Sequence, residues 1–290
     1  MPTSTQPLTV TLFDLEPAEI LPHGRHVLVD RPEAPSVPLV SRAGASTAGS
    51  DRAASAGTML PPGPAWSHRL AVFDLETTGI DVETSRIVTA NVSIIDHDGV
   101  CLSRLDWMAD PGIPIPAQAS AVHGVSTERA VAEGRPAAEV ITEVVSALAN
   151  ALDEGLSIVI YNAPYDLTLL DREAKRYGIQ PLGEPAAVVD PLVIDKALDR
   201  YRKGKRTLEA AALFYGVELL DAHDAGADAI AAGRVAQALA LRYGVELDVT
   251  QAELHRSQAR WFSEQATSFQ DYMRRTKDPT FTARTAWPLG

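Results

Sequence analysis

Residues 69–79 read RLAVFDLETTG. The apolar run at 70–73 is typical of a short buried strand, and two acids end it. Side chains alternate between the two faces of a strand, so Asp74 and Glu76 point the same way. After two threonines, Gly79 breaks the strand and permits a tight turn or the close approach of a ligand to the backbone. Two carboxylates on one face at a strand end predict metal ligands, although such a pair is also common as solvated charge.

A near copy of this motif occurs at residues 12–16, which read LFDLE. Pro17 follows the copy directly, and only a threonine-interrupted stretch leads into it. The copy therefore lacks both the apolar run and the glycine turn of the motif at 69–79. We interpret it as unrelated to a functional site, which means that the flanking residues, and not the acids alone, carry the prediction.

A second motif spans residues 157–172, SIVIYNAPYDLTLLDR. Its apolar run at 158–161 predicts a strand, and Asn162 is a typical helix N-cap. Pro164 falls in the first helical turn, where its missing N–H costs nothing. Asp166 would then lie one turn into the helix and face back over the strand end. Taken alone, such an acid is also typical of a residue that interacts with the helix dipole.

A third motif, LDAHDAGADA at residues 220–229, opens a predicted alanine-rich helix that runs to about Tyr243. His223 precedes this helix, and Asp228 lies in its first turn or so. Alone, the histidine and the neighbouring acids would be interpreted as capping residues. The combination of the three motifs changes this interpretation, because four carboxylates and one imidazole are what two hard divalent cations and an activated water require.

The motifs FDLETTG, NAPYDLTLL and HDAGAD, in this order and spacing, resemble the three signature motifs of the DEDDh exonuclease family. This family includes the proofreading epsilon subunit of bacterial replicative DNA polymerase, ribonuclease T and oligoribonuclease. The resemblance covers residues 67–243, and three motifs in order are far more specific than one. It implies a metal-dependent enzyme that hydrolyses phosphodiester bonds from the 3′ end.

The resemblance also implies a role for each acid. Asp74 would bridge two divalent cations, Mg²⁺ or Mn²⁺. Glu76 and Asp228 would complete the first metal site, and Asp166 would hold the second, largely through water. His223 would be the general base that takes a proton from the attacking water, a task that suits imidazole because its pKa lies near neutrality. Two cations can stabilise both the attacking hydroxide and the leaving 3′ oxygen of an in-line displacement at phosphorus.

Other positions match the family less closely. AVHGV at residues 121–125 resembles a histidine-glycine-isoleucine stretch that lies near the terminal nucleotide, although a His-Gly pair is also typical of an ordinary helix-entry turn. Relatives often have histidine and phenylalanine where this chain has Tyr161 and Tyr165, which leaves the substrate preference open. The substrate contacts predicted from the resemblance are Thr77, Thr78, Gly79, His123, Asn162 and Tyr165.

A basic segment, RYRKGKR at residues 200–206, lies between the second and third motifs. Five of its seven residues are basic, in a chain whose net charge is −12. Such a cluster attracts phosphate backbones with an affinity that falls as salt rises, although a charge run is also typical of a solvated face. The overall acidity argues against non-specific coating of duplex DNA. The predicted phosphate contacts are Arg202, Lys203, Lys205 and Arg206.

The composition is typical of a soluble cytoplasmic protein. The chain has 290 residues, 46% hydrophobic and 22% charged, which suffices for one sizeable core. A single cysteine, Cys101, excludes an internal disulfide framework and fits a reducing compartment. No apolar run approaches the ~20 residues that span a bilayer, and no secretory leader is apparent. These features predict a cytoplasmic protein with no membrane partner.

Three regions are predicted along the chain. Residues 1–66 hold ten of the twenty prolines, so we expect a mostly disordered arm. Residues 67–245 would form the exonuclease domain, and residues 246–290 a C-terminal helical extension and tail. The alternation of elements predicts an α/β domain with a mixed sheet flanked by helices, similar to ribonuclease H in strand order. Strands are predicted at 69–76, 86–96, 100–108, 157–161 and 187–189. Helices are predicted at 137–152 and 207–215, and a further helix runs from the third motif to about residue 243.

The expected ligand is the 3′ end of single-stranded nucleic acid, with DNA favoured over RNA. An exoribonuclease or short-oligonucleotide hydrolase is the alternative, because no residue can be assigned to the 2′-hydroxyl of ribose from sequence. A nucleic-acid-binding module that has lost catalysis is a second alternative, but all five expected residues are present. Replication proofreading, repair and RNA turnover would all accept this active site.

Two further segments are candidate partner contacts. The segment at 250–275 carries an apolar stripe at helical spacing, which consists of Leu254, Trp261, Phe262, Phe269, Tyr272 and Met273. Such a stripe is typical of packing on the chain's own domain, but it would also suit contact with a DNA polymerase subunit.

TVTLF at residues 9–13, beginning at Thr9, loosely resembles the peptides that bind sliding clamps, and only Leu12 and Phe13 match outright.

Overall fold

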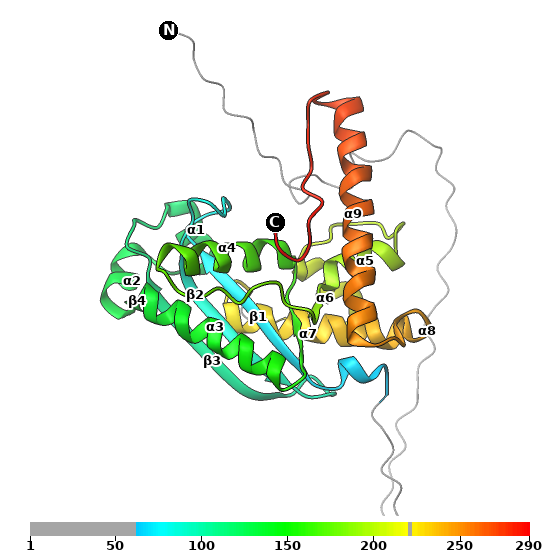
Figure 1. Ribbon diagram of the computed structural model, residues 1–290, viewed down its shortest axis with the longest axis horizontal. Coiled ribbons are helices and arrows are strands. Elements are labelled where there is room, and N and C mark those ends of the chain that lie inside the picture. Colours follow the sequence, from blue (N-terminus) through cyan, green and yellow to red (C-terminus); the bar gives the residue numbers. More distant parts are fainter. Residues whose placement is uncertain (1–61, 220–221) are drawn as a thin grey trace, which may run out of the picture.

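Figure 1 shows the computed structural model of the chain, which describes residues 62–219 and 222–290. Its centre is a six-stranded mixed sheet in the order β4-β3-β2-β1-β5-β6. β1, β2 and β3 are antiparallel neighbours, whereas β5 is parallel to β1, β6 to β5 and β4 to β3. The strands are β1 (Leu70–Thr77), β2 (Ile87–Ile95), β3 (Cys101–Asp110), β4 (Arg135–Pro136), β5 (Ser157–Val159) and β6 (Val188–Val189).

Helices cover both faces of this sheet. α3 and α4 pack on one face, and α6 and α7 on the other (Figure 1). Alternate residues of β1 pack on opposite faces of the sheet, since Phe73 packs with α3 and Val72 with α7. Burial on both faces explains why the run before the acids is continuously apolar. The helices are the 3₁₀ turn η2 (Ala65–Ser67), α1 (Ala117–His123), α2 (Thr127–Glu133), α3 (Ala137–Asp153), α4 (Ala163–Arg176), α5 (Pro191–Leu198), α6 (Leu208–Tyr215), α7 (Ala225–Arg242), α8 (Gly244–Leu247) and α9 (Gln251–Thr276).

The predicted α/β fold with a ribonuclease H-like mixed sheet is confirmed. The strands predicted at 69–76, 86–96 and 100–108 correspond to β1, β2 and β3. α1, α2, α5 and α8 were not among the predicted helices. α1 and α2 are each seven residues long and almost wholly unburied, so no apolar stripe reveals their period. α5 did carry a signal, because Asp190 is its side-chain N-cap and Pro191 its first residue.

The first part of the apolar stripe of α9 packs on the chain's own domain, as its spacing favoured, whereas Phe269 packs on Phe281 of the chain that follows the helix. Leu254 and Met273 are buried, and Trp261 packs against the cores on both sides of the sheet. α9 contacts α5 and β6. The division of the chain at residue 245 stays a prediction, and the packing of α9 makes the residues beyond it continuous with the preceding domain.

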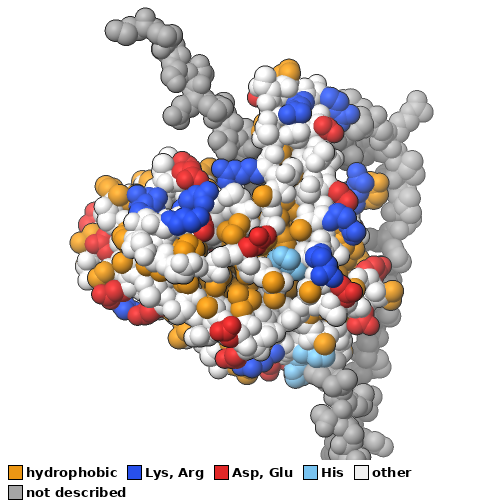
Figure 2. All heavy atoms as spheres, viewed as in Figure 1, with side chains coloured by type: hydrophobic (Ala, Val, Ile, Leu, Met, Phe, Trp, Pro, Cys, Tyr) orange, Lys and Arg blue, Asp and Glu red, His pale blue; other side chains and the backbone are white. Residues whose placement is uncertain are grey.

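Several predictions concern residues that the structure does not describe. Residues 1–61 of the predicted arm, which include the LFDLE copy and the clamp-like peptide that begins at Thr9, lie outside the described residues. The end of the predicted arm at 1–66 is ordered instead, because Trp66 is buried and its indole N–H donates to the Leu247 carbonyl at 2.9 Å. Within 62–219 and 222–290, no helix is long and apolar enough to cross a membrane. On the face seen in Figure 2, Lys and Arg side chains are dispersed among acidic and apolar ones.

Candidate active site

The end of β1 carries Asp74 and Glu76 on the side of the sheet that faces α7. Both side chains are half-buried, while Leu75 between them is buried against the opposite core. Asp74 pairs across the sheet with Asn91, and the pairing becomes irregular between Glu76 and the next residue. This alternation confirms that the two acids share a face.

Asp166 lies in the first turn of α4, as predicted, and is 4% exposed. Asn162 precedes the helix in the left-handed conformation, with φ of 68°, and its side chain makes no capping hydrogen bond. The predicted capping role of the Asn162 side chain is therefore wrong. The carboxylate of Asp190 caps the helix instead, because it accepts hydrogen bonds from the N–H groups of Asn162 at 3.1 Å and Ala163 at 3.0 Å.

The first turn of α7 brings His223 and Asp228 to the acids of β1. Asp224 caps the helix by accepting a hydrogen bond from the Ala227 N–H at 2.9 Å. The backbone N–H of His223, whose φ is 72°, donates to Asp228 Oδ2 at 3.2 Å. Ligand atoms of Glu76, His223 and Asp228 lie within 4.8 Å of one another. Three of the five predicted residues therefore form one compact group.

Electrostatic interactions place Asp74 and Asp166 in the same group. Burial raises the pKa of Asp74 well above its usual range, and the nearby charges of Asp166, Glu76 and Asp228 raise it further. Burial likewise raises the pKa of Asp166, and the charge of Glu76 adds to this effect although the Leu75 N–H opposes it. Carboxylates influence one another in this way only when they are close neighbours. The end of β1 therefore gathers all four acids.

This set of donors fits divalent cations. Burial, followed by the charges of Asp228 and Asp224, raises the pKa of Glu76 to about 8. Burial also raises the pKa of Asp228 to about 6. Among the described residues, Asp228 Oδ1 is buried and finds no hydrogen-bond partner. Clustered carboxylates that repel one another are stabilised by a cation between them, and carboxylate oxygens are the ligands that Mg²⁺ and Mn²⁺ prefer.

The loop that begins at the end of β1 is hydrogen-bonded to a tyrosine of α4. Tyr165 Oη donates a hydrogen bond to the Gly79 carbonyl at 2.5 Å and lies 2.6 Å from Thr77 Oγ1. The Thr78 N–H donates to the Arg86 carbonyl at 3.0 Å, which ties the loop to the residue before β2. Tyr165 therefore orients this loop through its hydroxyl group. Contact of Thr77, Thr78, Gly79, Asn162 and Tyr165 with a substrate stays a prediction.

His123 lies at the end of α1, close to the acidic group. Gly124, with φ of 74°, ends α1, and Ser126 caps α2, so the His-Gly pair does form a turn between helices. His123 Nδ1 accepts a hydrogen bond from the Val125 N–H at 3.2 Å, which leaves the proton of the neutral ring on Nε2. Burial lowers the pKa of His123, and the charge of His223 acts in the same direction. A substrate contact by His123 stays a prediction.

The basic segment at 200–206 is built around a buried carboxylate. Asp195 of α5 is fully buried and accepts hydrogen bonds from Arg202 at 2.8 and 3.1 Å and from Arg206 at 2.7 Å. Tyr215 donates to the same carboxylate at 2.6 Å. The prediction that Arg202 and Arg206 contact phosphate is not supported, because both guanidinium groups are paired inside the protein.

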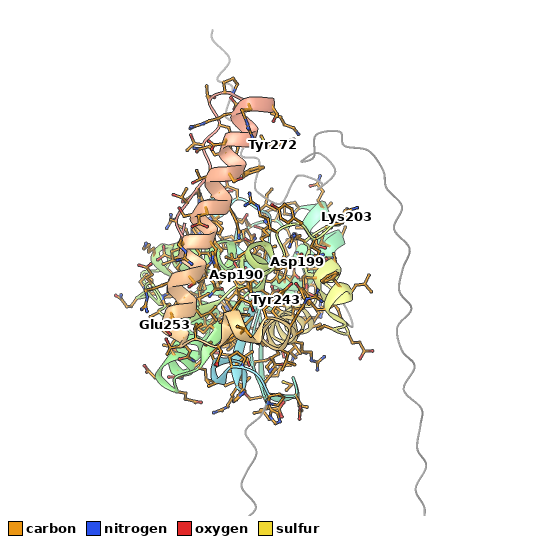
Figure 3. All side chains as sticks on the ribbon, turned by 90° about the vertical axis from the view of Figure 1, so that its right-hand side faces the viewer. Asp190, Asp199, Lys203, Tyr243, Glu253 and Tyr272 are labelled. Carbon is orange, nitrogen blue, oxygen red and sulfur yellow. The ribbon has the colours of Figure 1, made fainter. Side chains whose placement is uncertain are left out.

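The basic segment and the helix that follows it contact residues near the candidate site. Tyr161 Oη donates to the Arg206 carbonyl at 2.7 Å and so joins the segment to the end of β5. Glu209, in the first turn of α6, lies 3.9 Å from His223 Nε2. Lys203 and Lys205 are exposed, and Figure 3 shows Lys203 at the edge of the molecule. Contact of these two lysines with phosphate stays a prediction.

Sequence reasoning missed a row of polar side chains that crosses the sheet. Asn91, opposite Asp74, donates to Asp106 Oδ1 at 2.8 Å, and Arg104 donates to Asp106 Oδ2 at 2.7 Å. Arg104 also donates to Asp224, the N-cap of α7, at 3.1 Å. The row thus connects the residue beside Asp74 to the helix that carries Asp228. The available signal was the alternation of Thr89, Asn91 and Ser93 with apolar residues along β2.

A ribonuclease H-like sheet whose central strand ends among clustered acids defines a class of metal-binding nucleic-acid enzymes. The chain belongs to the exonuclease family, whose model matches residues 71–236, more than half of its length. Within that family, the resemblance to the DEDDh 3′-to-5′ exonucleases is confirmed.

Similar proteins match different shares of the chain. A DNA polymerase III subunit epsilon-like protein of Rhodobacter capsulatus is 39% identical over 109 residues, which are 37% of this chain and only 15% of that protein. DNA polymerase III subunit epsilon of Treponema pallidum is 28% identical over 158 residues, which are 54% of this chain and 69% of that protein. The solved structure of E. coli exonuclease I in complex with a dT13 oligonucleotide is 17% identical with a TM-score of 0.53, covering 62% of this chain and 43% of that one. At this identity the structural likeness shows the fold.

Proposed function

We propose that the chain is a divalent-metal-dependent 3′-to-5′ exonuclease that removes nucleotides from single-stranded DNA ends. The observation that carries this proposal is the convergence of four acids and His223 at the end of β1, in a chain of the exonuclease family. The acids come from three separate stretches of sequence. The four carboxylates repel one another, which supports a role in holding cations. The acids are Asp74, Glu76, Asp166 and Asp228.

The charges of all three other acids raise the pKa of Asp74, so Asp74 would be shared between two metal sites. Glu76 and Asp228 would complete one site and Asp166 the other. Bound Mg²⁺ or Mn²⁺ supplies charge neutralisation at the phosphate and lowers the pKa of a water molecule. The protein holds the four carboxylates close together before the ions arrive, so little reorganisation is needed during the reaction.

His223 would accept the proton of the attacking water. Its imidazole remains accessible, with 45% of the side chain exposed, and it borders Glu76 and Asp228. The hydrogen bond from the His223 N–H to Asp228 holds the residue at the start of α7. Glu209 lies 3.9 Å from Nε2, where its charge would stabilise the imidazolium that forms. The proton would then pass to solvent from the exposed ring.

Single-stranded DNA is the substrate that we favour. E. coli exonuclease I, which shares the fold, binds a dT13 oligonucleotide. Work beside a DNA polymerase, in proofreading or repair in the cytoplasm, is a further part of this proposal, and it is supported by relatives named as epsilon subunits. The clamp-like peptide at 9–13 has no support among the comparisons and is not part of the proposal.

A ladder assay on 5′-labelled single-stranded DNA and RNA, with Mg²⁺ or Mn²⁺, tests the proposal. We expect Asp74→Ala and His223→Ala to lose activity by about 10² or more, because each removes a group that acts in the transition state. Asp14→Ala is the matched control, since Asp14 lies in the near-identical LFDLE and should not matter. Equal degradation by all four proteins would show that the assigned site is wrong. Faster cleavage of RNA than of DNA would favour the exoribonuclease alternative.

A further inference from the structure

The start of α4 depends on Asp190, a residue outside the proposed catalytic set. Asp190 is 1% exposed, and its carboxylate accepts hydrogen bonds from the N–H groups of Asn162 and Ala163 at the start of α4. It also accepts the Leu192 N–H at 3.0 Å in the first turn of α5. One carboxylate therefore closes two helix ends, whose N–H groups have no partner within their own helices. Because Asp166 lies one turn into α4, its position follows from that of Asp190.

Gln258 of α9 completes the edge of the sheet next to Asp190. Its Oε1 accepts the Asp190 N–H at 2.6 Å, and its Nε2 donates to the Val188 carbonyl at 2.9 Å. These two backbone groups flank Val189 and are the ones that a neighbouring strand would pair with. β6 is the last strand of the sheet, and Gln258 is fully buried. The amide thus replaces a missing strand and fixes the backbone that leads into Asp190.

The chain after α9 returns to the same place. It runs back along α9, and its end lies beside α4 (Figure 1). The indole N–H of Trp287 donates to Asp190 Oδ2 at 3.5 Å, and its ring lies 4.8 Å from that of His255. The Gly290 N–H donates to Thr168 Oγ1 of α4 at 2.9 Å. Figure 3 shows Asp190 beside α9, so the helix and the returning tail both contact this carboxylate residue.

We propose that Gln258 and Trp287 are positioning residues for the metal site. They hold Asp190, Asp190 sets the start of α4, and α4 places Asp166 among the other acids. This inference rests on the proposed function. It also gives the buried side of α9 a role inside the chain, so a polymerase that bound this region would have to contact the exposed sides of the helix.

Two substitutions remove the contacts to Asp190 with little change of shape. Gln258→Leu deletes the amide that pairs with β6, and Trp287→Phe deletes the indole N–H while keeping an aromatic ring on His255. Gln265→Leu is the matched control. Gln265 also lies on α9, and its Nε2 donates to the Val193 carbonyl of α5 at 3.0 Å, whereas the hydrogen bonds of Asp190 come from other residues. A loss of stability common to all three variants would thus be separated from an effect on Asp166.

Metal binding and local opening are the readouts. Calorimetric titration of the full-length chain with Mn²⁺ should show affinity about 10-fold weaker in Gln258→Leu and severalfold weaker in Trp287→Phe, since groups that orient metal ligands act at this scale. Amide exchange across residues 160–170 should be faster in both variants than in the wild type. Gln265→Leu should keep the wild-type Mn²⁺ affinity even if its melting temperature falls.

The proposal and the underlying function fail in different ways. Wild-type Mn²⁺ affinity in Gln258→Leu and Trp287→Phe, with unchanged exchange at 160–170, overturns the positioning role and leaves the nuclease assignment intact. Equal weakening of Mn²⁺ binding in Gln265→Leu also overturns it, because the effect would then come from general destabilisation. Failure of the wild type to bind Mn²⁺, or binding that Asp74→Ala leaves unchanged, overturns the proposed function and this inference with it.

Discussion

Replacing Glu76 by glutamine should stabilise the metal-free protein at alkaline pH. Burial and two neighbouring acids raise the pKa of Glu76 from its ordinary 4.5 to about 8. At ~1.4 kcal/mol for each pKa unit, the ionised group would destabilise the folded state by ~5 kcal/mol in a closed site. The site is partly open, so solvent screening reduces this to about 2–3 kcal/mol. For a domain of this size, such a gain corresponds to about 5–10 °C in melting temperature.

The effect has a defined direction with pH. Below the ordinary pKa of 4.5, Glu76 is protonated in the folded and the unfolded chain, so glutamine offers no advantage. Between 4.5 and about 8 the unfolded chain has released the proton while the folded chain retains it. Stability therefore falls as the pH rises through this window, and the penalty is complete above about 8. Glutamine resembles the protonated acid and cannot ionise, so the variant does not lose this stability.

Thermal unfolding followed by circular dichroism tests this argument. With EDTA, Glu76→Gln should melt with the wild type at about pH 5 and above it at about pH 9. Adding Mn²⁺ should raise the melting temperature of the wild type and have little effect on the variant, because a ligand is missing. Glu264→Gln, on the exposed side of α9, is the control and should change neither result. A Glu76→Gln variant that melts below the wild type at the alkaline pH, or an equal response of both to Mn²⁺, would refute the reasoning.

Three further outcomes follow from the structure. Mn²⁺ should bind more tightly as the pH rises from about 5 to about 8, because Asp228 and Glu76 must release protons first, and calorimetry at three pH values measures this. Asp195→Asn should destabilise the chain by about 3–5 kcal/mol in urea unfolding, since it leaves two buried guanidinium groups without a counter-charge; a loss below about 1 kcal/mol would contradict this. Gly226→Ala would bring a Cβ to 2.3 Å from Arg104 Nη2 and displace the Arg104 side chain from Asp224. Alanine favours a helix over glycine by up to about 1 kcal/mol, and we expect this gain in stability only in an Arg104→Ala background. Additive effects in a double-mutant cycle would argue against this contact.

Local patterns in the sequence predicted much of the fold and the identity of the acids. The alternation of side chains along β1 placed Asp74 and Glu76 on one face, and the same rule holds in the structure. The segments predicted as helical from Thr207 and from Thr250 do form helices, and in each the threonine is the N-cap that accepts a hydrogen bond through its side chain. These features depend on residues within a few positions of one another, so they can be read from the chain without knowing its path.

The arrangement that supports these acids depended on contacts between distant residues. Asn162 satisfied a local capping rule, but Asp190, 28 positions away, took that role because the end of β5 brings the two together. Arg202 and Arg206 looked like phosphate ligands until α5 placed a buried carboxylate beneath them. Local periodicity and composition are properties of neighbouring residues, and from them came the strands, most helices and the acids of the three motifs. Which charges stay available to a substrate is a property of the packed chain, because a buried partner neutralises a charge regardless of its distance in sequence.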